Sequence, residues 1–535
     1  MKLLRRWFAG ATLCLMVGVL AGCSLPSLEE RSTSQALSVE EARATTFGRL
    51  LAPQVQAHPG KSGIYSLADA HDAYAARVLL ARSAEKTLDV QCYIWLNDVT
   101  GTLLMSELRQ AADRGVRVRL LLDDNGTSGL DEQLAALHTH PNIEVRLFNP
   151  FVIRKPKAIG YITDFKRANR RMHNKSFTAD NQATIIGGRN VGDEYFGAGS
   201  MLFADLDVLA VGPVVDDVSS DFDLYWASES SYPADLILPE ANELTLEKLA
   251  QIAKDTTASD AAGQYTKAVQ RSEFLAGLLE GRIEFEWAAT TMLSDDPAKG
   301  LGKATESSML ISQLADMLGK PEKSVDLVSP YFVPTAAGVE VFAAIVDSGI
   351  QLRVLTNSLD ATDVAVVHAG YVKRRKDLLE ANVPLYEMRR MAEDDGSSAG
   401  STGLGLGSRG SGGSGSSGAS GSIGSSGSSL HAKTFAVDEK RIFVGSFNFD
   451  PRSALFNTEL GFIIESPRMA RDIQAAFDED IPNSAYEVKL SDSGSVYWVE
   501  RRDGQIIRHD TEPETGFFKR CIVWVLSKLP IERML

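Results

Sequence analysis

The sequence contains the same order of elements twice, and this internal duplication limits the fold more than any other feature. Residues 87–122 hold an apolar strand, a helical stretch and a second apolar strand, and residues 324–355 repeat that order. Strand–helix–strand units of this kind make right-handed crossovers between parallel strands. The sequence therefore predicts an α/β fold of two pseudo-symmetric units, each with a mixed, largely parallel sheet flanked by helices.

Composition and periodicity divide the rest of the chain around these units. Glycine and serine dominate residues 395–429, and such a segment buries too little apolar surface to fold, so a flexible loop is expected there. The expected organisation is a signal peptide at 1–22, a tether at 23–60, a first unit at 61–225, a helical connection at 226–305, a second unit at 306–490 that contains the Gly/Ser loop, and a C-terminal segment at 491–535.

The N-terminus predicts export. Three basic residues precede an apolar run over 7–20 that is too short to span a bilayer comfortably, as in a signal peptide. The run ends in Leu-Ala-Gly-Cys, which resembles a bacterial lipobox and implies acylation of Cys23. We therefore expect an exported protein that is lipid-anchored to a bacterial membrane, on the periplasmic side, with the choice of inner or outer membrane left open. A cleaved signal without lipidation is the alternative.

The C-terminal segment also bears on the membrane. Residues 517–529 mix aromatic and aliphatic side chains with lysine and arginine. A helix of this composition can lie in a membrane interface, and it can equally pack on the protein's own core. The sequence leaves both interpretations open.

Charge and cysteine content argue against several classes of protein. The chain has 55 basic and 70 acidic side chains, a net charge of -15, which is the wrong sign for binding nucleic-acid backbones. A nucleic-acid partner is therefore not expected. The four cysteines, including Cys92 and Cys521, have the spacing of neither a disulfide framework nor a zinc site. No metal and no other cofactor is expected.

A polar pattern of fixed spacing occurs once in each unit. It consists of a histidine and a lysine two residues apart, an aspartate five residues later and, after six more residues, two small residues, any residue and an asparagine. One chance match in a chain of this length has a probability on the order of 10⁻⁵, so two matches at corresponding places indicate a shared function. The members are His173, Lys175, Asp180, Gly188 and Asn190 in the first unit, and His431, Lys433, Asp438, Ser446 and Asn448 in the second.

The spacing also predicts local structure. Alternation along a strand puts the histidine and lysine of each pattern on one face. Asp180 and Asp438 begin hairpin turns, because a short apolar strand follows each of them, and we expect both to stabilise these turns rather than touch substrate. Folding each hairpin is expected to set Gly188 and Ser446 opposite the histidines of their own units. Small residues there would let a phosphate approach.

The two patterns resemble the signature of the phospholipase D superfamily, and the resemblance covers residues from about 64 to 490. Phosphodiester exchange needs a nucleophile, an acid and positive charge, and two histidine–lysine pairs supply all three. The resemblance implies one active site shared by both units, with His173 as the nucleophile that forms a phosphohistidine and His431 as the acid and base. The residues alone leave the two histidines equivalent. The phosphate would be held by Lys175, Lys433, Asn190 and Asn448.

A nucleophilic histidine needs a partner that fixes its tautomer. Corresponding positions in the two units hold Asp205 and Glu459, each eight residues before a proline in an apolar stretch. These two acids are the predicted partners of the histidines. Glu459 matches the family's orienting glutamate. Asp207 faces the same side as Asp205 and is the alternative to it.

Other polar residues have competing interpretations. His138 and His140 have the spacing of a metal pair but no further ligands nearby, so a solvated loop is expected. His368 resembles residues near the rim of the family's site. The basic run 166–171 leads into the first pattern, and it is either a solvated face or a surface that attracts anionic headgroups.

Within the superfamily, the stretches 192–196 and 358–371 are most similar to bacterial cardiolipin synthases. This resemblance implies a phosphatidyltransferase that uses membrane phospholipids and makes cardiolipin from phosphatidylglycerol. Such enzymes often carry transmembrane helices, whereas this chain carries a lipobox. Hydrolysis to phosphatidic acid is the first alternative and a nuclease is the second. The third is a non-catalytic membrane scaffold, which gives no reason for two complete patterns.

Overall fold

The fold is described by a computed structural model. It describes residues 25–199, 201–241, 244–271, 274, 277, 283–390, 427–530 and 532. The expected signal peptide, the acylated Cys23 and all but the last residues of the Gly/Ser loop lie outside these ranges. Those three expectations stay predictions.

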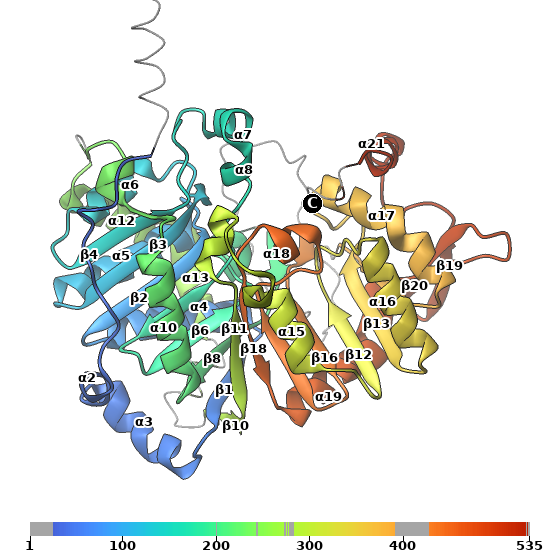
Figure 1. Cartoon of the computed structure of the whole chain (residues 1–535), viewed down its shortest axis with the longest axis horizontal. Helices are drawn as coiled ribbons and strands as arrows, with labels where there is room; N and C mark the ends of the chain where they lie inside the picture. The colour runs from blue at the N-terminus through green and yellow to red at the C-terminus, as the bar shows by residue number, and fades with distance from the viewer. Residues whose placement is uncertain are drawn as a thin grey trace, which may run out of the picture.

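The first unit is built on a nine-stranded sheet, shown on the left of Figure 1. Alternating side chains of its central strand face opposite layers: Leu120 and Leu122 pack in the core that contains helices α4 (Ala70–Ser83) and α5 (Val99–Asp113), whereas Leu121 packs against α10 (Val214–Ala227). In order across the sheet, the strands are β10 (Glu286–Ala288), β1 (Ser62–Leu67), β8 (Asp207–Val211), β6 (Ala183–Gly187), β5 (Ser176–Ala179), β2 (Thr87–Ile94), β3 (Arg117–Gly126), β4 (Ile143–Phe148) and β9 (Ser231–Pro233).

The second unit repeats this plan in a ten-stranded sheet with helices α15 (Leu310–Leu318), α16 (Ala336–Asp347), α17 (Ala365–Glu380) and α19 (Pro467–Ala475). Its strands, in order, are β11 (Thr290–Ser294), β18 (Leu460–Ile464), β17 (Arg441–Gly445), β16 (Thr434–Val437), β12 (Ser324–Val328), β13 (Gln351–Asn357), β14 (Leu385–Met388), β19 (Ala485–Leu490), β20 (Val496–Arg502) and β21 (Gln505–His509).

The two units form one body. A single buried cluster contains side chains from both sheets, among them Ile186, Val208, Val444 and Phe462. A separate pair of parallel strands, β7 (Met201–Ala204) and β15 (Gly427–Leu430), also joins the units. The α/β fold of two related units with mixed sheets is therefore confirmed.

Parallel pairing is more limited than the sequence suggested. Only β2, β3 and β4 in the first sheet, and β12, β13 and β14 in the second, pair in parallel. The strands that carry the polar patterns return through three-residue turns, at 180–182 and 438–440, and turns this short join antiparallel neighbours.

The segment at 226–305 is not wholly helical. It contains α12 (Leu246–Thr257) and α13 (Asp260–Gln270), but residues 286–294 form β10 and β11. These two strands pair antiparallel with β1 and β18, so one joins the edge of each sheet. The helical expectation is wrong there because a three-residue and a five-residue strand leave too short a pattern to separate from a helix.

The described part of the expected tether is bound to the first unit. It contains α2 (Val39–Arg43) and α3 (Thr46–Ala57). Arg119 and Arg146 donate hydrogen bonds of 3.0 and 2.7 Å to the carbonyls of Ser34 and Ser32. Arginines of the sheet therefore hold the backbone of this segment, which is not a free linker.

The C-terminal helix α21 (Phe517–Ser527) packs on the protein along one side, and its place in a membrane interface stays a prediction. Val523 is buried beside Leu359 and Ala369, at the start of α17. On the outer side, Phe518 is 81% exposed and Trp524 is 62% exposed. No helix in the described part of the chain has both the length and the apolar character needed to cross a membrane.

Candidate active site

Each polar pattern lies on a hairpin, β5–β6 in the first unit and β16–β17 in the second. The turn residues Asp180 and Asp438 have φ angles of 50° and 56°, in the left-handed region that aspartate adopts more readily than most residues. The Asp180 carboxylate accepts hydrogen bonds of 2.7–2.9 Å from three backbone N–H groups at 85–87, and Asp438 accepts equivalent bonds at 322–324. Both aspartates thus tie a turn to the start of the neighbouring strand.

The two histidines are oriented by carboxylates of the opposite unit. His173 Nδ1 lies 2.7 Å from Glu459 Oε2, and His431 Nδ1 lies 2.5 Å from Asp205 Oδ2. Asp207, the alternative to Asp205, instead pairs with an arginine on α4, at 2.8 Å. The sequence predicted both acids but not the exchange between units, which depends on how the two sheets pack.

Burial controls the protonation of this centre. Burial lowers the pKa of His173 to about 4 and that of His431 to about 3, against the opposing effect of their carboxylates. Burial opposes ionisation of Glu459 and Asp205, but their cationic and hydrogen-bonding neighbours prevail and lower both pKa values. At neutral pH each histidine is therefore neutral, donates its Nδ1–H to a carboxylate and keeps the Nε2 lone pair free.

The lysines provide the positive charge of the site. Lys175 Nζ donates to the carbonyl of His173 at 2.6 Å, and Lys433 Nζ makes the equivalent bond to His431. Burial lowers the pKa of Lys175 to about 7 and that of Lys433 to about 8. Two buried lysines beside the histidines are suited to hold an anionic phosphate.

The sequence predicted that the small residue of each pattern lies opposite the histidine of its own unit. This prediction is wrong. The register pairs Ser176 with Ile186, which leaves Gly188 out of line with His173. A Cβ on Gly188 would come within 2.1 Å of Asp205 Oδ1. Glycine is therefore required for the carboxylate that holds the other unit's histidine.

Ser446 has the corresponding place in the second unit. Its hydroxyl donates to Glu459 Oε2 at 2.6 Å. The small residue of each unit thus contacts the acid of its own unit, and that acid holds the opposite histidine. The hairpin prediction took two residues for each turn, whereas three separate the paired strands, and the extra residue shifts the register by one.

The asparagines also lie at this centre. Asn190 Oδ1 accepts a hydrogen bond of 3.2 Å from the N–H of Ile94. Its Nδ2 is buried and has no hydrogen-bond partner among the described residues. That donor is available to a phosphate oxygen. Asn448 is buried as well, three per cent exposed, on the loop that follows β17.

Sequence reasoning missed the aromatic rings at the site. Tyr93, near the end of β2, packs edge-on against His173 with ring centroids 4.8 Å apart, and Lys175 Nζ lies 5.4 Å from the same ring. Tyr195, in α9 (Asp193–Phe196), packs edge-on against His431 at 5.3 Å. Tyr195 belongs to the stretch 192–196 quoted for the family resemblance, but no motif marks Tyr93.

The other histidines lie elsewhere. His138 and His140 pair with different aspartates, Asp235 and Asp113, so they do not form a metal site. His368 is buried 3.7 Å from Glu512. Among the described residues, no cluster of histidine, cysteine and acidic side chains is arranged to hold a metal ion.

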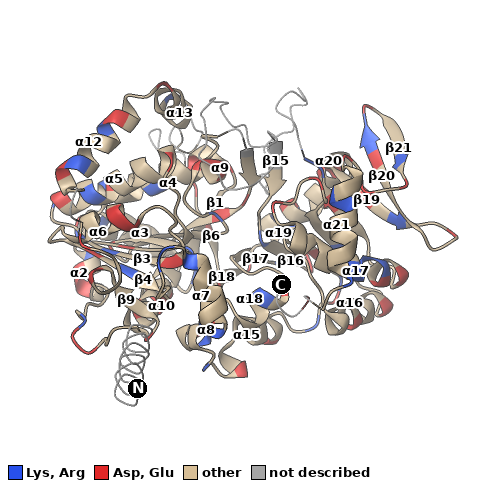
Figure 2. Ribbon diagram, turned by 90° about the horizontal axis from the view of Figure 1, so that it is seen from above, with Lys and Arg blue, Asp and Glu red and all other residues tan. Residues whose placement is uncertain are grey.

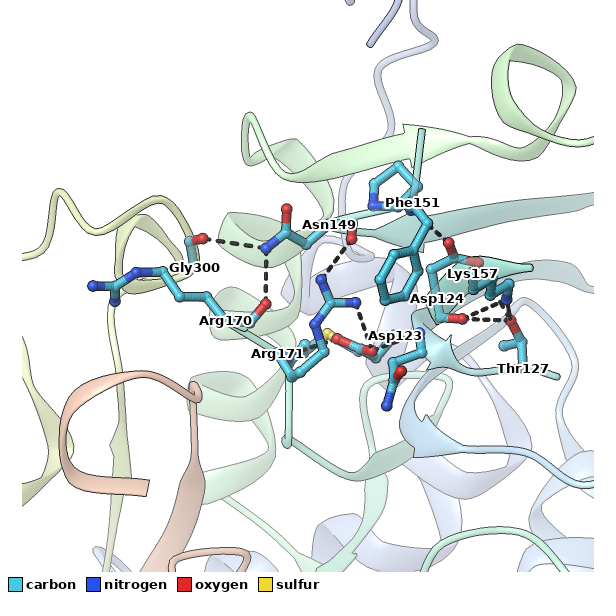
Figure 3. Close-up of polar contacts among 12 residues, drawn as sticks. Asp123, Asp124, Thr127, Asn149, Phe151, Lys157, Arg170, Arg171 and Gly300 are labelled. Atoms are coloured by element: carbon cyan, nitrogen blue, oxygen red, sulfur yellow. Dashed lines mark hydrogen bonds and ion pairs between the residues drawn. The ribbon is translucent and has the colours of Figure 1, made fainter. Parts of the chain in front are cut away.

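The basic run before the first pattern is mainly structural. Figure 3 shows Arg171 between Asp123 and the carbonyl of Asn149, at 3.3 and 2.9 Å. Asp123 also accepts the N–H of Met172 at 2.7 Å. These bonds fix the chain where it enters the site. Neither interpretation of the run applies to Arg171, which is almost fully buried.

Comparisons with known proteins agree with this geometry. Residues 79–226 and 314–481 match the family described as "Cardiolipin synthase, PLD-like domain". The chain is 47% identical over 486 residues to "Cardiolipin synthase C" of Escherichia coli (strain K12), covering 90% of this chain and 98% of that one. It is 32% identical over 486 residues to a Helicobacter pylori protein, covering 89% and 90%.

A solved structure supports the fold. The phosphatidylserine synthase of Haemophilus influenzae is 13% identical, with a TM-score of 0.55 over 90% of this chain and 99% of that chain. The duplicated pattern, the shared centre and the family match together show that the chain belongs to the phospholipase D superfamily, in the cardiolipin synthase family with phospholipase D-like domains.

Proposed function

We propose that this protein is a phosphatidyltransferase that makes cardiolipin from two molecules of phosphatidylglycerol. The observation that carries the proposal is the shared centre, in which each histidine is held through Nδ1 by a carboxylate of the other unit and lies beside a buried lysine. The similarity to "Cardiolipin synthase C" supports the choice of substrate.

In the first step, His173 Nε2 attacks phosphorus while the bond from phosphorus to the headgroup glycerol breaks. The bound phosphodiester anion favours the imidazolium form of His431, which gives its Nε2 proton to the departing glycerol oxygen. The product of this step is a phosphatidyl group bound to His173, together with free glycerol.

In the second step, the headgroup hydroxyl of another phosphatidylglycerol gives its proton to His431 Nε2. Its oxygen attacks phosphorus and the phosphorus–nitrogen bond breaks. Cardiolipin is released, His173 is regenerated and the proton on His431 is restored. If water takes the place of the acceptor hydroxyl, the product is phosphatidic acid.

The partners of the enzyme are membrane phospholipids, and α21 and the loop before the first pattern support a membrane surface as its place of work. Ile162 in α7 (Gly160–Thr163) is 85% exposed, and Phe165 in α8 (Phe165–Ala168) is 42% exposed. Figures 1 and 2 show α7 and α8 on one side of α18 (Pro451–Leu455), with α21 on the other. Exposed apolar side chains in such helices enter the lipid headgroup region favourably. Acyl chains on Cys23, on the periplasmic side, would hold the protein there.

The test uses purified protein and vesicles that contain phosphatidylglycerol. Cardiolipin and free glycerol should form in equal amounts, with phosphatidic acid as the minor product, because a site that excludes water favours the lipid hydroxyl. The variant His173→Ala should form neither product. Predominant phosphatidic acid would make the enzyme a hydrolase.

A further inference from the structure

A buried ion pair, Asp295 and Lys299, contacts the backbone of Glu459. Asp295 follows β11, and Lys299 lies in the short helix η2 (Pro297–Leu301). Lys299 Nζ lies 2.9 Å from Asp295 Oδ2, and both side chains are fully enclosed. This pair comes from the connection at 226–305, where the sequence showed no motif.

The pair holds the backbone of Glu459. Asp295 Oδ2 accepts the Glu459 N–H at 2.9 Å, and the Asp295 N–H donates to the Glu459 carbonyl at 3.0 Å. Lys299 Nζ also donates to the carbonyl of Ser453 at 2.8 Å. The Ser453 hydroxyl in turn donates to Glu459 Oε1 at 2.7 Å. Asp295 therefore fixes the main chain of Glu459, while Lys299 fixes a residue that holds its carboxylate.

The other acid is held differently. The carbonyl of Asp205 accepts a hydrogen bond of 2.7 Å from Arg189. Asp205 Oδ1 accepts the N–H of Leu206 at 2.8 Å. The Glu459 carboxylate instead accepts hydrogen bonds from two serine hydroxyls. The Asp295–Lys299 pair thus supports one half of a centre that is otherwise close to symmetric.

Stability alone does not account for this pair. Removing two charges from water is costly, and replacing a buried ion pair with apolar residues of similar volume is often neutral or stabilising. A fixed orientation of the group that the pair holds is one reason to retain it.

We propose that Asp295 and Lys299 are positioning residues that act through Glu459 to keep His173 in the tautomer with Nε2 free. The inference rests on the proposed function for its kinetic readout but not for its spectroscopic one. Formation of the phosphorus–nitrogen bond on His173 then depends on the pair. The orientation and tautomer of the His431 ring do not.

The experiment compares Lys299→Met with Lys303→Met, a control in the same segment whose ion pair with Glu229 is exposed. NMR of protein labelled with ¹⁵N-histidine should show the ring signals of His173 changed in Lys299→Met and those of His431 unchanged. With phosphatidylglycerol, the rate of phosphohistidine formation in Lys299→Met should fall about 10- to 100-fold, as on loss of the outer-shell partners that orient metal-ligating histidines. The KM should stay within about twofold of the control.

Each result separates the two proposals. Unchanged His173 signals and an unchanged rate in folded Lys299→Met would overturn the positioning role, as would equal loss of both histidine signals. If the His173 signals change in Lys299→Met but the unmodified protein makes no lipid product, only the proposed function is rejected. If Lys299→Met does not fold, Asp295→Asn/Lys299→Met carries the same test, because it removes both charges and leaves one oxygen for the N–H groups of Glu459 and Leu310, which Asp295 accepts on two.

Discussion

At the scale of single residues, the two halves of the centre differ at Gly188 and Ser446. Gly188→Ala would drive a methyl carbon into the Asp205 carboxylate. We expect this change to lower kcat by about 100-fold or more, because a small displacement of an orienting group disturbs the attack geometry. Ser446→Gly, which copies the first unit, should cost about tenfold through one lost hydrogen bond to Glu459. Steady-state kinetics on the two variants would contradict the assignment if Ser446→Gly proved the more damaging.

The roles of the histidines give a second residue-scale prediction. Protein quenched in acid-free conditions during turnover should carry a phosphatidyl group on His173. His431→Ala should accumulate this adduct or form it slowly, since proton transfer fails, and His173→Ala should never form it. Mass spectrometry of the digested protein would locate it. An adduct on His431 would reverse the assignment.

The lysines predict the alkaline limb of the pH profile. The pKa values of Lys175 and Lys433, about 7 and about 8, lie below the ordinary value for lysine, so both lose their charge as the pH rises through this window. The kcat/KM should fall above pH 7–8, because that parameter reports the free enzyme and an uncharged amine binds phosphate weakly. A profile that stays flat to pH 9.5 would show that the lysines remain protonated.

At the scale of helices and strands, the sequence predicted the elements that depend on residues close together in the chain. The turns at Asp180 and Asp438 could be predicted because two polar residues interrupt two apolar strands. The short strand β10 could not, since it forms only by pairing with β1, more than 200 residues away in sequence. The exchange of Asp205 and Glu459 between units was hidden for the same reason: it depends on packing, which no spacing along the chain encodes.

The outer side of α21 predicts how the protein meets a bilayer. In a Cys23→Ser background, which excludes the expected acyl anchor, Phe518→Asp/Trp524→Asp should reduce co-sedimentation with anionic vesicles at least about tenfold, because two charges enter the apolar face. Leu224→Asp, at an exposed leucine on α10, is the control. Activity on a dispersed short-chain lipid should remain. Equal binding of both proteins would remove α21 from the membrane contact.

At the scale of the whole molecule, the buried histidines tie stability to pH. Their pKa values of about 4 and about 3 lie below the ordinary value of 6.5, so the unfolded chain binds more protons than the folded one below pH 6.5. The free energy of unfolding should therefore fall as the pH drops from 6.5 towards 4. His173→Gln/His431→Gln should show a shallower decline in urea titrations at pH 7.5, 6 and 5. An equal slope would place the acid sensitivity elsewhere.

The exchange of carboxylates between the two units also has a consequence for how such a duplicated chain can evolve. Because His173 depends on Glu459 and His431 on Asp205, neither half of the duplicated chain contains a complete centre. An ancestor the size of one half would have needed two identical copies, each lending its acid to the other. Fusion of such copies into one gene would remove the need for identity. Each half could then change its own acid, as with Asp205 and Glu459, and selection would act on that change through the histidine of the other half.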